Sequence, residues 1–195
     1  MLHHLFKNKQ LRLGGFYELS IQVCPSLIMS PITEDTNYIK SLKNVDGPYN
    51  KDFELKAIEV EGYEHEWILN LENHTIPFKT FNIRESQPLE TGFNWFDICF
   101  YTAAIEQIFG LEYQTWSENP NCPIELNDFF NKTLVDLNNI YKFQMAMIDF
   151  EISGQYYLTD LYSEINNWTH SRFFINRENA NLISNSNKNV VRIID

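Results

Sequence analysis

The sequence predicts an α+β fold, in which an antiparallel sheet has helices packed on one of its faces. Segments with the two-residue alternation of strands stand both before and after a helical block, and they do not alternate regularly with helices. The 195 residues suit a single domain, and the 44% hydrophobic content, with 15 Phe and 10 Tyr, supplies the apolar surface for a core. We therefore expect one globular domain over residues 1–195.

The first strand is predicted from the segment FYELSIQV, residues 16–23. Its polar residues alternate with apolar ones, which is the period of a half-buried strand with one solvated face. Pro25 is expected to end the strand. The apolar positions are Tyr17, Leu19, Ile21 and Val23, and the polar positions are Glu18, Ser20 and Gln22.

A short amphipathic helix is predicted for residues 33–45, TEDTNYIKSLKNV, because acids stand in its first turn and lysines in its last. The sequence Asp46-Gly47-Pro48 then predicts a turn. Three β-rich runs follow, FELKAIEVE, EWILNL and TIPFKTFNI, and they predict a meander whose second connection is Glu72-Asn73-His74. The alternation slips at Ala57/Ile58 and at Thr80/Phe81, so we expect a bulge or a strand end at each place.

The most apolar segment, NWFDICFYTAAIEQIFG, predicts a buried helix over residues 94–109 that ends at Gly110. A second helix is predicted from Pro123 to residue 141, because Phe and Leu recur there at helical spacing. Residues 143–152, FQMAMIDFEI, predict a further strand. The terminal segment VVRIID predicts an edge strand after an Asn-rich loop over residues 176–189.

Cys99 lies in the most apolar segment and has two interpretations. If Asp97 caps the helix, Cys99 falls in the first turn, where a thiol pKa is lowered, and His170 could act as the base of a cysteine-dependent hydrolase. If Asn94 caps the helix, Cys99 lies deeper and packs in the core. Apolar residues surround the predicted helix on most sides, which favours the core position.

The sequence contains none of the common catalytic or nucleotide-binding motifs, such as a phosphate-binding loop, GxSxG or HExxH. We therefore expect no cofactor, no metal and no enzymatic activity. Asp149 and Glu151, two residues apart on a predicted strand, are expected on one solvated face. The three cysteines are widely spaced, which indicates reduced thiols and a cytoplasmic location, and we expect neither a leader nor a membrane span.

Acidic residues are concentrated in the middle of the chain. The net charge is −11, and residues 46–164 hold 21 acids and 6 bases, whereas the rest of the chain holds 5 acids and 9 bases. Such a field repels nucleic acid and anionic membranes, and it attracts basic proteins. Solubility alone is the other explanation for an acidic chain.

These features predict a small binding protein that recognises and neutralises a basic protein, by analogy with bacterial immunity proteins and their toxins. The alternatives are the hydrolase and a structural subunit that associates with itself through exposed edge strands. The contact surface is expected in the meander, where aromatic anchors would be ringed by acids, although Trp67 fits a core position equally well. Its candidate residues are Glu59, Glu61, Tyr63, Glu64, Glu66, Trp67 and Glu72.

Overall fold

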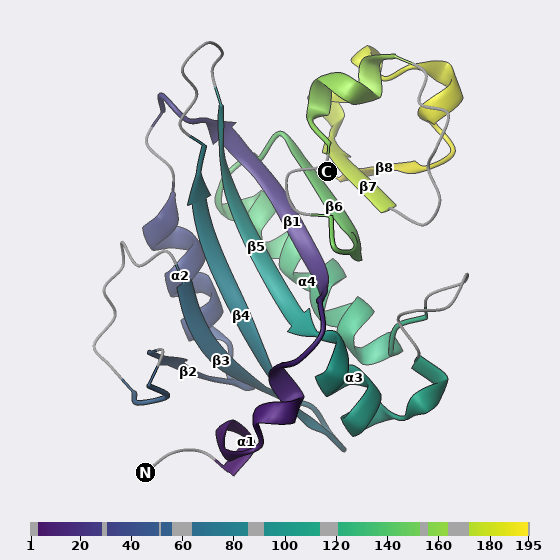
Figure 1. Ribbon diagram of the computed structural model, residues 1–195. Coiled ribbons are helices and arrows are strands. Elements are labelled where there is room, and N and C mark those ends of the chain that lie inside the picture. Colours follow the sequence, from purple (N-terminus) through teal and green to yellow (C-terminus); the bar gives the residue numbers. More distant parts are fainter. Residues whose placement is uncertain are drawn as a thin grey trace.

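The chain forms one sheet with helices packed against it (Figure 1). The computed structural model describes residues 4–28, 31–50, 52–55, 64–85, 92–113, 121–152, 156–163 and 172–194. Within these ranges, eight strands form a single sheet in the order β2-β3-β4-β5-β1-β6-β7-β8. Every pairing is antiparallel except that of β7 with β8, so the predicted α+β class is confirmed. The strands are β1 (Phe16–Pro25), β2 (Val45–Tyr49), β3 (Glu64–Asn70), β4 (Thr75–Arg84), β5 (Phe93–Tyr101), β6 (Met145–Phe150), β7 (Arg172–Asn176) and β8 (Val191–Ile194).

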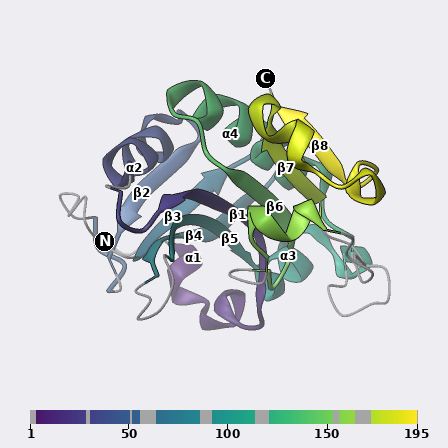
Figure 2. The same cartoon turned by 90° about the horizontal axis from the view of Figure 1, so that it is seen from above.

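The two main helices, α2 (Ile32–Ser41) and α4 (Ile124–Ile140), cover one face of the sheet, which we call the first face (Figure 2). The short helix α1 (His4–Lys7) lies against the opposite side, which we call the second face (Figure 2). None of the helices in the described ranges has the length and apolar character needed to cross a bilayer. The other helical segments are η1 (Lys9–Arg12), α3 (Thr102–Phe109), η2 (Leu111–Tyr113), η3 (Leu158–Tyr162), η4 (Arg177–Leu182) and η5 (Asn185–Asn187).

The main core lies between the first face and the helices α2 and α4. Leu19 and Ile21 of β1 pack there with Phe96 of β5 and Phe130 of α4, and all four side chains are at most 1% exposed. The apolar positions of the first strand therefore share one face, as the alternation predicts. The stripe of Phe and Leu on α4 is likewise confirmed as part of the core.

The polar positions of β1 are buried instead of solvated. Glu18, Ser20 and Gln22 are at most 2% exposed on the second face, so the predicted solvated face is wrong. The chain that follows β6 folds back over β1 and supplies backbone donors to these side chains. The Leu158 N–H donates to Gln22 Oε1 at 2.8 Å, and the Ile152 N–H donates to Glu18 Oε1. These bonds offset part of the cost of burying polar groups.

The predicted helix over residues 94–109 is wrong in its first half, because β5 continues to Tyr101 and α3 begins only at Thr102. β5 lies in the middle of the sheet, paired with β4 on one side and β1 on the other. A strand covered on both faces reads as a continuous apolar run, which periodicity does not separate from a buried helix. Gly110 does end α3, as predicted.

Two local expectations in the meander are also corrected. The sequence Asp46-Gly47-Pro48 is not a turn but part of β2, whose pairing with β3 shifts register between Asp46 and Tyr49. Conversely, β4 pairs without interruption through Thr80 and Phe81, so no bulge or strand end occurs there. The slip expected at Ala57/Ile58 lies outside the described residues.

Candidate functional site

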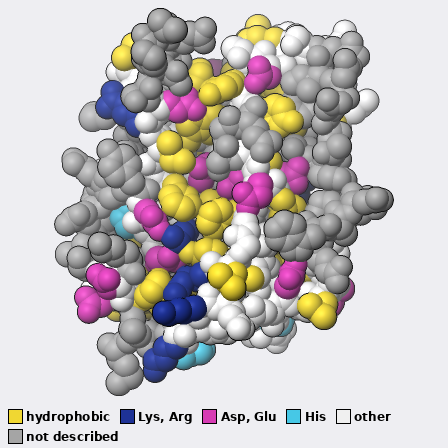
Figure 3. Space-filling view, in the orientation of Figure 1, with side chains coloured by type: hydrophobic (Ala, Val, Ile, Leu, Met, Phe, Trp, Pro, Cys, Tyr) yellow, Lys and Arg dark blue, Asp and Glu magenta, His cyan; other side chains and the backbone are white. Residues whose placement is uncertain are grey.

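The second face of the sheet carries most of the polar side chains that project from the central strands. Register places Glu66 opposite Lys79, Phe81 opposite Asp97, and Cys99 opposite Glu18. Successive strands β3, β4, β5 and β1 therefore present acidic and aromatic side chains side by side. Figure 3 shows this face, where acidic side chains lie among a band of hydrophobic ones and a group of Lys and Arg side chains lies below them.

Two apolar clusters flank the middle of the second face. At the β3 side, Phe6 of α1 packs with Ile68 and Tyr49. At the β6 side, Leu158 and Leu161 of η3 pack with other buried residues of the sheet. A hollow of about 250 Å³ lies on this face, lined by Phe16, Glu18, Phe81, Ile83, Asp97, Cys99 and Glu151.

The hollow has a buried floor and an accessible rim. Glu18, Asp97 and Cys99 form the floor and are at most 2% exposed. Ile83 and Glu151 are exposed on the rim, and Phe16 and Phe81 are half-buried there. The rings of Phe16 and Phe81 meet edge to face, with their centroids 6.0 Å apart. A ligand in this hollow would therefore touch aromatic carbon at the sides and carboxylate oxygen below.

Hydrogen bonds hold the floor side chains in place. The Ser20 hydroxyl donates to Asp97 Oδ1 at 2.6 Å, and the Cys99 thiol donates to Glu18 Oε2 at 3.4 Å. Bonds to carboxylate oxygens are among the stronger hydrogen bonds in proteins. The floor is therefore preorganised, because the neighbouring strands β1 and β5 fix the position of its carboxylates.

Glu151 reaches the hollow from just beyond the end of β6. Its carboxylate accepts a hydrogen bond from the Phe16 N–H, and its backbone has a φ of 52°. The expectation that Asp149 and Glu151 share one solvated strand face is therefore wrong, because the strand ends between them. Asp149 lines a different hollow, beside Tyr17 and Arg172.

Cys99 is buried, and its thiol is held in the protonated form. Burial raises the pKa of Cys99 well above its ordinary value, and the neighbouring carboxylates of Asp97 and Glu18 raise it further. The residue lies on β5 and not in the first turn of a helix, so the helix-start interpretation is wrong. The buried interpretation is confirmed, although the thiol faces carboxylates instead of the apolar core. His170 lies outside the described residues.

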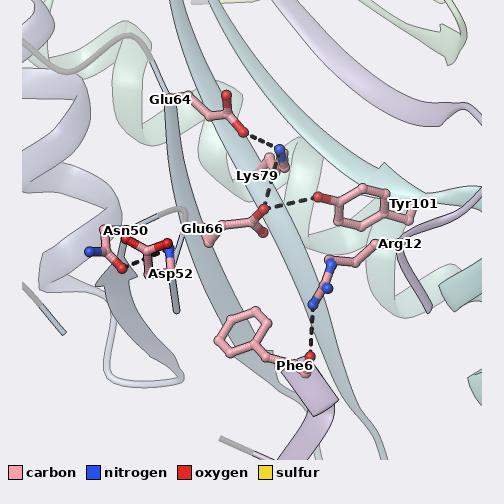
Figure 4. A network of polar contacts seen from close by, with 8 residues as sticks. All are labelled: Phe6, Arg12, Asn50, Asp52, Glu64, Glu66, Lys79 and Tyr101. Atoms are coloured by element: carbon pink, nitrogen blue, oxygen red, sulfur yellow. Dashed lines mark hydrogen bonds and ion pairs between the residues drawn. The ribbon is translucent and has the colours of Figure 1, made fainter. Parts of the chain in front are cut away.

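A second polar cluster lies next to the hollow and includes two of the predicted contact residues (Figure 4). Lys79 pairs with Glu64 and, at 3.2 Å, with Glu66 Oε1. The Tyr101 hydroxyl donates to Glu66 Oε1 at 3.1 Å, whereas Glu66 Oε2 has no hydrogen-bond partner among the described residues. Burial raises the pKa of Glu66, and Lys79 opposes that rise. The Lys79 ammonium also lies over the rings of Phe81 and Tyr101, 5.6 and 5.9 Å from their centroids.

The structure separates the predicted contact residues. Trp67 is fully buried on the first face, where its indole N–H donates to Thr80 Oγ1 at 2.9 Å, so it is a core residue and not a surface anchor. Glu72 is exposed in the turn after β3, at the opposite end of that strand from Glu64. Of the predicted contact residues that the structure describes, only Glu64 and Glu66 lie together on the second face. Glu59, Glu61 and Tyr63 lie outside the described residues.

Sequence reasoning singled out Cys99 but did not bring it together with Glu18, Asp97 and Glu151 in one hollow. Asp97 stands between apolar residues in the most apolar segment of the chain, and Glu18 stands between the apolar residues of β1. Burying an acid in a central strand costs free energy unless hydrogen bonds or opposite charges compensate it. An acid at these two positions was therefore the signal in the sequence that could have indicated a site. Among the described residues, no group of His, Cys, Asp and Glu side chains has the arrangement of a metal site.

Comparisons with protein-family models, with curated proteins and with solved structures found no match to this chain. The geometry and electrostatics of the second face are therefore the basis for assigning a function.

Proposed function

We propose that this protein binds a basic protein and neutralises it, and that the second face of the sheet is the contact surface. The observation that carries this proposal is the hollow, in which carboxylates and aromatic rings meet beneath an accessible rim. The proposed contact residues are Phe16, Glu18, Glu64, Phe81, Ile83, Asp97 and Glu151. They include Glu64 from the contact residues expected from the sequence, whereas Glu59, Glu61 and Tyr63 lie outside the described residues and stay predictions.

The charge of this face supports a cationic partner. The net charge of the chain is −11, and acids reach the second face from the strands β1, β3 and β5 and from Glu151 just after β6. Carboxylates in a concave site with low-dielectric walls strengthen the local electrostatic potential, and this potential attracts cations from a distance. The same potential disfavours nucleic acid and anionic lipid.

The apolar part of the face supports a protein partner. Ile83 is 41% exposed, and it lies on the rim beside the half-buried ring of Phe81. Protein interfaces concentrate binding energy in apolar and aromatic side chains that are surrounded by polar groups. A rim of this composition would contribute packing, while the acids would select for a basic surface.

The protonated, buried thiol of Cys99 gives the alternative of a cysteine-dependent hydrolase no support. Neutralisation by binding needs no chemistry in this chain, because covering the functional surface of a partner is sufficient.

The test uses a rim variant and a matched control. Glu64→Gln with Glu151→Gln removes two exposed charges from the second face, and Glu34→Gln with Asp128→Asn removes two exposed charges from α2 and α4. Basic host proteins, isolated by cation exchange, are passed over the immobilised wild type and both variants at low salt. We expect a partner that the wild type and the control retain and the rim variant loses. Equal retention by all three proteins would refute the second face as the contact surface.

A further inference from the structure

We infer that the hollow on the second face is a socket for one arginine side chain of the partner. This inference rests on the proposed function and specifies the chemistry of its contact surface. The hollow supplies the two features that a guanidinium uses, which are aromatic faces along its plane and carboxylate oxygens at its edge.

The carboxylates of the hollow come from three directions. Glu18 projects from β1, Asp97 from β5 and Glu151 from the chain just after β6. A guanidinium has five N–H donors in one plane, whereas an ammonium is a compact and strongly hydrated point charge. A planar cation therefore matches carboxylates that are spread around a hollow better than lysine does.

The walls of the hollow favour an organic cation over a metal ion. Phe16 and Phe81, whose rings pack edge to face against each other, both line it, and Ile83 completes the apolar lining. No described group of acidic, thiol or imidazole side chains has the arrangement that holds a metal. A guanidinium stacks on aromatic rings at little desolvation cost, so aromatic walls are compatible with it.

The same face already binds a cation of its own chain in this manner. The Lys79 ammonium pairs with Glu64 and Glu66 and lies over the rings of Phe81 and Tyr101. Phe81 also lines the hollow, so one ring is shared by the occupied cation position and the proposed socket. The arrangement of carboxylates and rings around Lys79 is therefore repeated next to it by Glu18, Asp97, Phe16 and Phe81.

The volume of the hollow, about 250 Å³, suits one long side chain and not a folded segment. Its floor is almost fully buried, so a guanidinium that reached it would interact with the carboxylates away from bulk water. Opposite charges attract each other more strongly when they are buried away from water. The socket would therefore contribute to the choice of partner as well as to the affinity for it.

The test uses three capped tripeptides as probes, Gly-Arg-Gly, Gly-Lys-Gly and Gly-citrulline-Gly, with the full chain labelled for NMR. Citrulline keeps the shape of arginine and lacks its charge. We expect the arginine peptide to shift the amide signals of Phe16, Phe81 and Asp97. Its affinity should exceed that of the lysine peptide several-fold and that of the citrulline peptide about ten-fold or more.

Variants locate the binding. Glu151→Gln and Phe81→Leu, both on the rim, should each weaken the arginine peptide several-fold, whereas Glu34→Gln on α2 should leave it unchanged. Unfolding midpoints of the variants show that loss of binding does not come from loss of the fold. Equal binding of the arginine and citrulline peptides, or shifts confined to residues outside the hollow, would overturn the socket.

The two proposals fail separately. If the wild type retains a basic partner through Glu64 and Glu151 but the arginine peptide does not enter the hollow, the socket is wrong and the contact surface stands. If the arginine peptide binds in the hollow but no basic partner is retained, the socket stands and the proposed function is wrong.

Discussion

Cys99 lies directly opposite Glu18 on the neighbouring strand, and its thiol donates a hydrogen bond to Glu18 Oε2 at 3.4 Å. A thiol that is 1% exposed and has a raised pKa is a poor nucleophile. We expect an alkylating reagent at neutral pH to label Cys99 only after unfolding. Peptide mapping of the labelled protein measures this, and rapid labelling of Cys99 in the folded state would contradict the buried placement.

The Cys99→Ala variant tests the same site through stability. We expect it to lower the free energy of unfolding by about 1–2 kcal/mol. The substitution leaves a small cavity, and Glu18 loses the hydrogen bond that the thiol donates to it. Denaturant unfolding of wild type and variant measures the difference. No loss of stability would mean that the thiol is not packed in the floor of the hollow.

Asp35 gives the fold a pH dependence. Its side chain is fully buried on α2, Tyr141 donates a hydrogen bond to it, and burial raises the pKa of Asp35 to about 8. Because the folded pKa lies above the unfolded one, near 4, the stabilising contribution is complete below about pH 4 and is lost as pH rises toward 8. The Asp35→Asn variant should lack this loss and be more stable than wild type at pH 8.

The pH profile of the unfolding free energy tests this, with Asp128→Asn at an exposed position of α4 as the control. The control should keep the slope of the wild type between pH 4 and 8. Parallel profiles for wild type and Asp35→Asn would show that Asp35 is not protonated in the folded state at neutral pH.

Leu134 and Phe130 test the packing of α4 on the first face. Both are at most 1% exposed, so Leu134→Ala and Phe130→Ala should each cost about 2–5 kcal/mol of stability. Val135, which is 48% exposed on the same helix, provides the control, and Val135→Ala should change stability by about 0.5 kcal/mol or less. Similar effects at all three positions would be inconsistent with this packing.

Gly15 tests the rim of the hollow. A Cβ at this position would overlap the Glu151 carboxylate, so Gly15→Ala should displace Glu151 and break its bond with the Phe16 N–H. We expect a shifted Phe16 amide signal, a loss of about 1 kcal/mol of stability and weaker binding of the arginine peptide. An unchanged Phe16 signal together with unchanged binding would place Glu151 away from the hollow.

Helices and strands could be predicted from the sequence where the apolar residues follow a single period, either that of a strand or that of a helix. β1 alternates, α4 repeats at helical spacing, and both were placed correctly. β5 was taken for a helix because its apolar residues are covered on both faces by different partners, which conceals the two-residue period. The local pattern carries no information about what covers a strand.

The candidate site was harder to predict than the fold. Glu18, Asp97 and Glu151 are far apart in the chain, and only the order and register of the strands bring them to one hollow. The acidic bias was visible in the composition, but the register that brings Glu18 and Asp97 to the same face was not. Trp67 shows the same limit, because a strand residue in an unknown register belongs to either face.

Association kinetics of the retained partner with the wild type, the Glu64→Gln/Glu151→Gln variant and the Glu34→Gln/Asp128→Asn control provide the decisive comparison. Rim charges act chiefly through the on-rate, and salt screens them once the Debye length falls below about 8 Å. At low salt, the rim variant should associate several-fold more slowly than wild type and control, and the three rates should converge at high salt. An on-rate of the rim variant equal to that of the wild type at low salt would contradict binding through the second face.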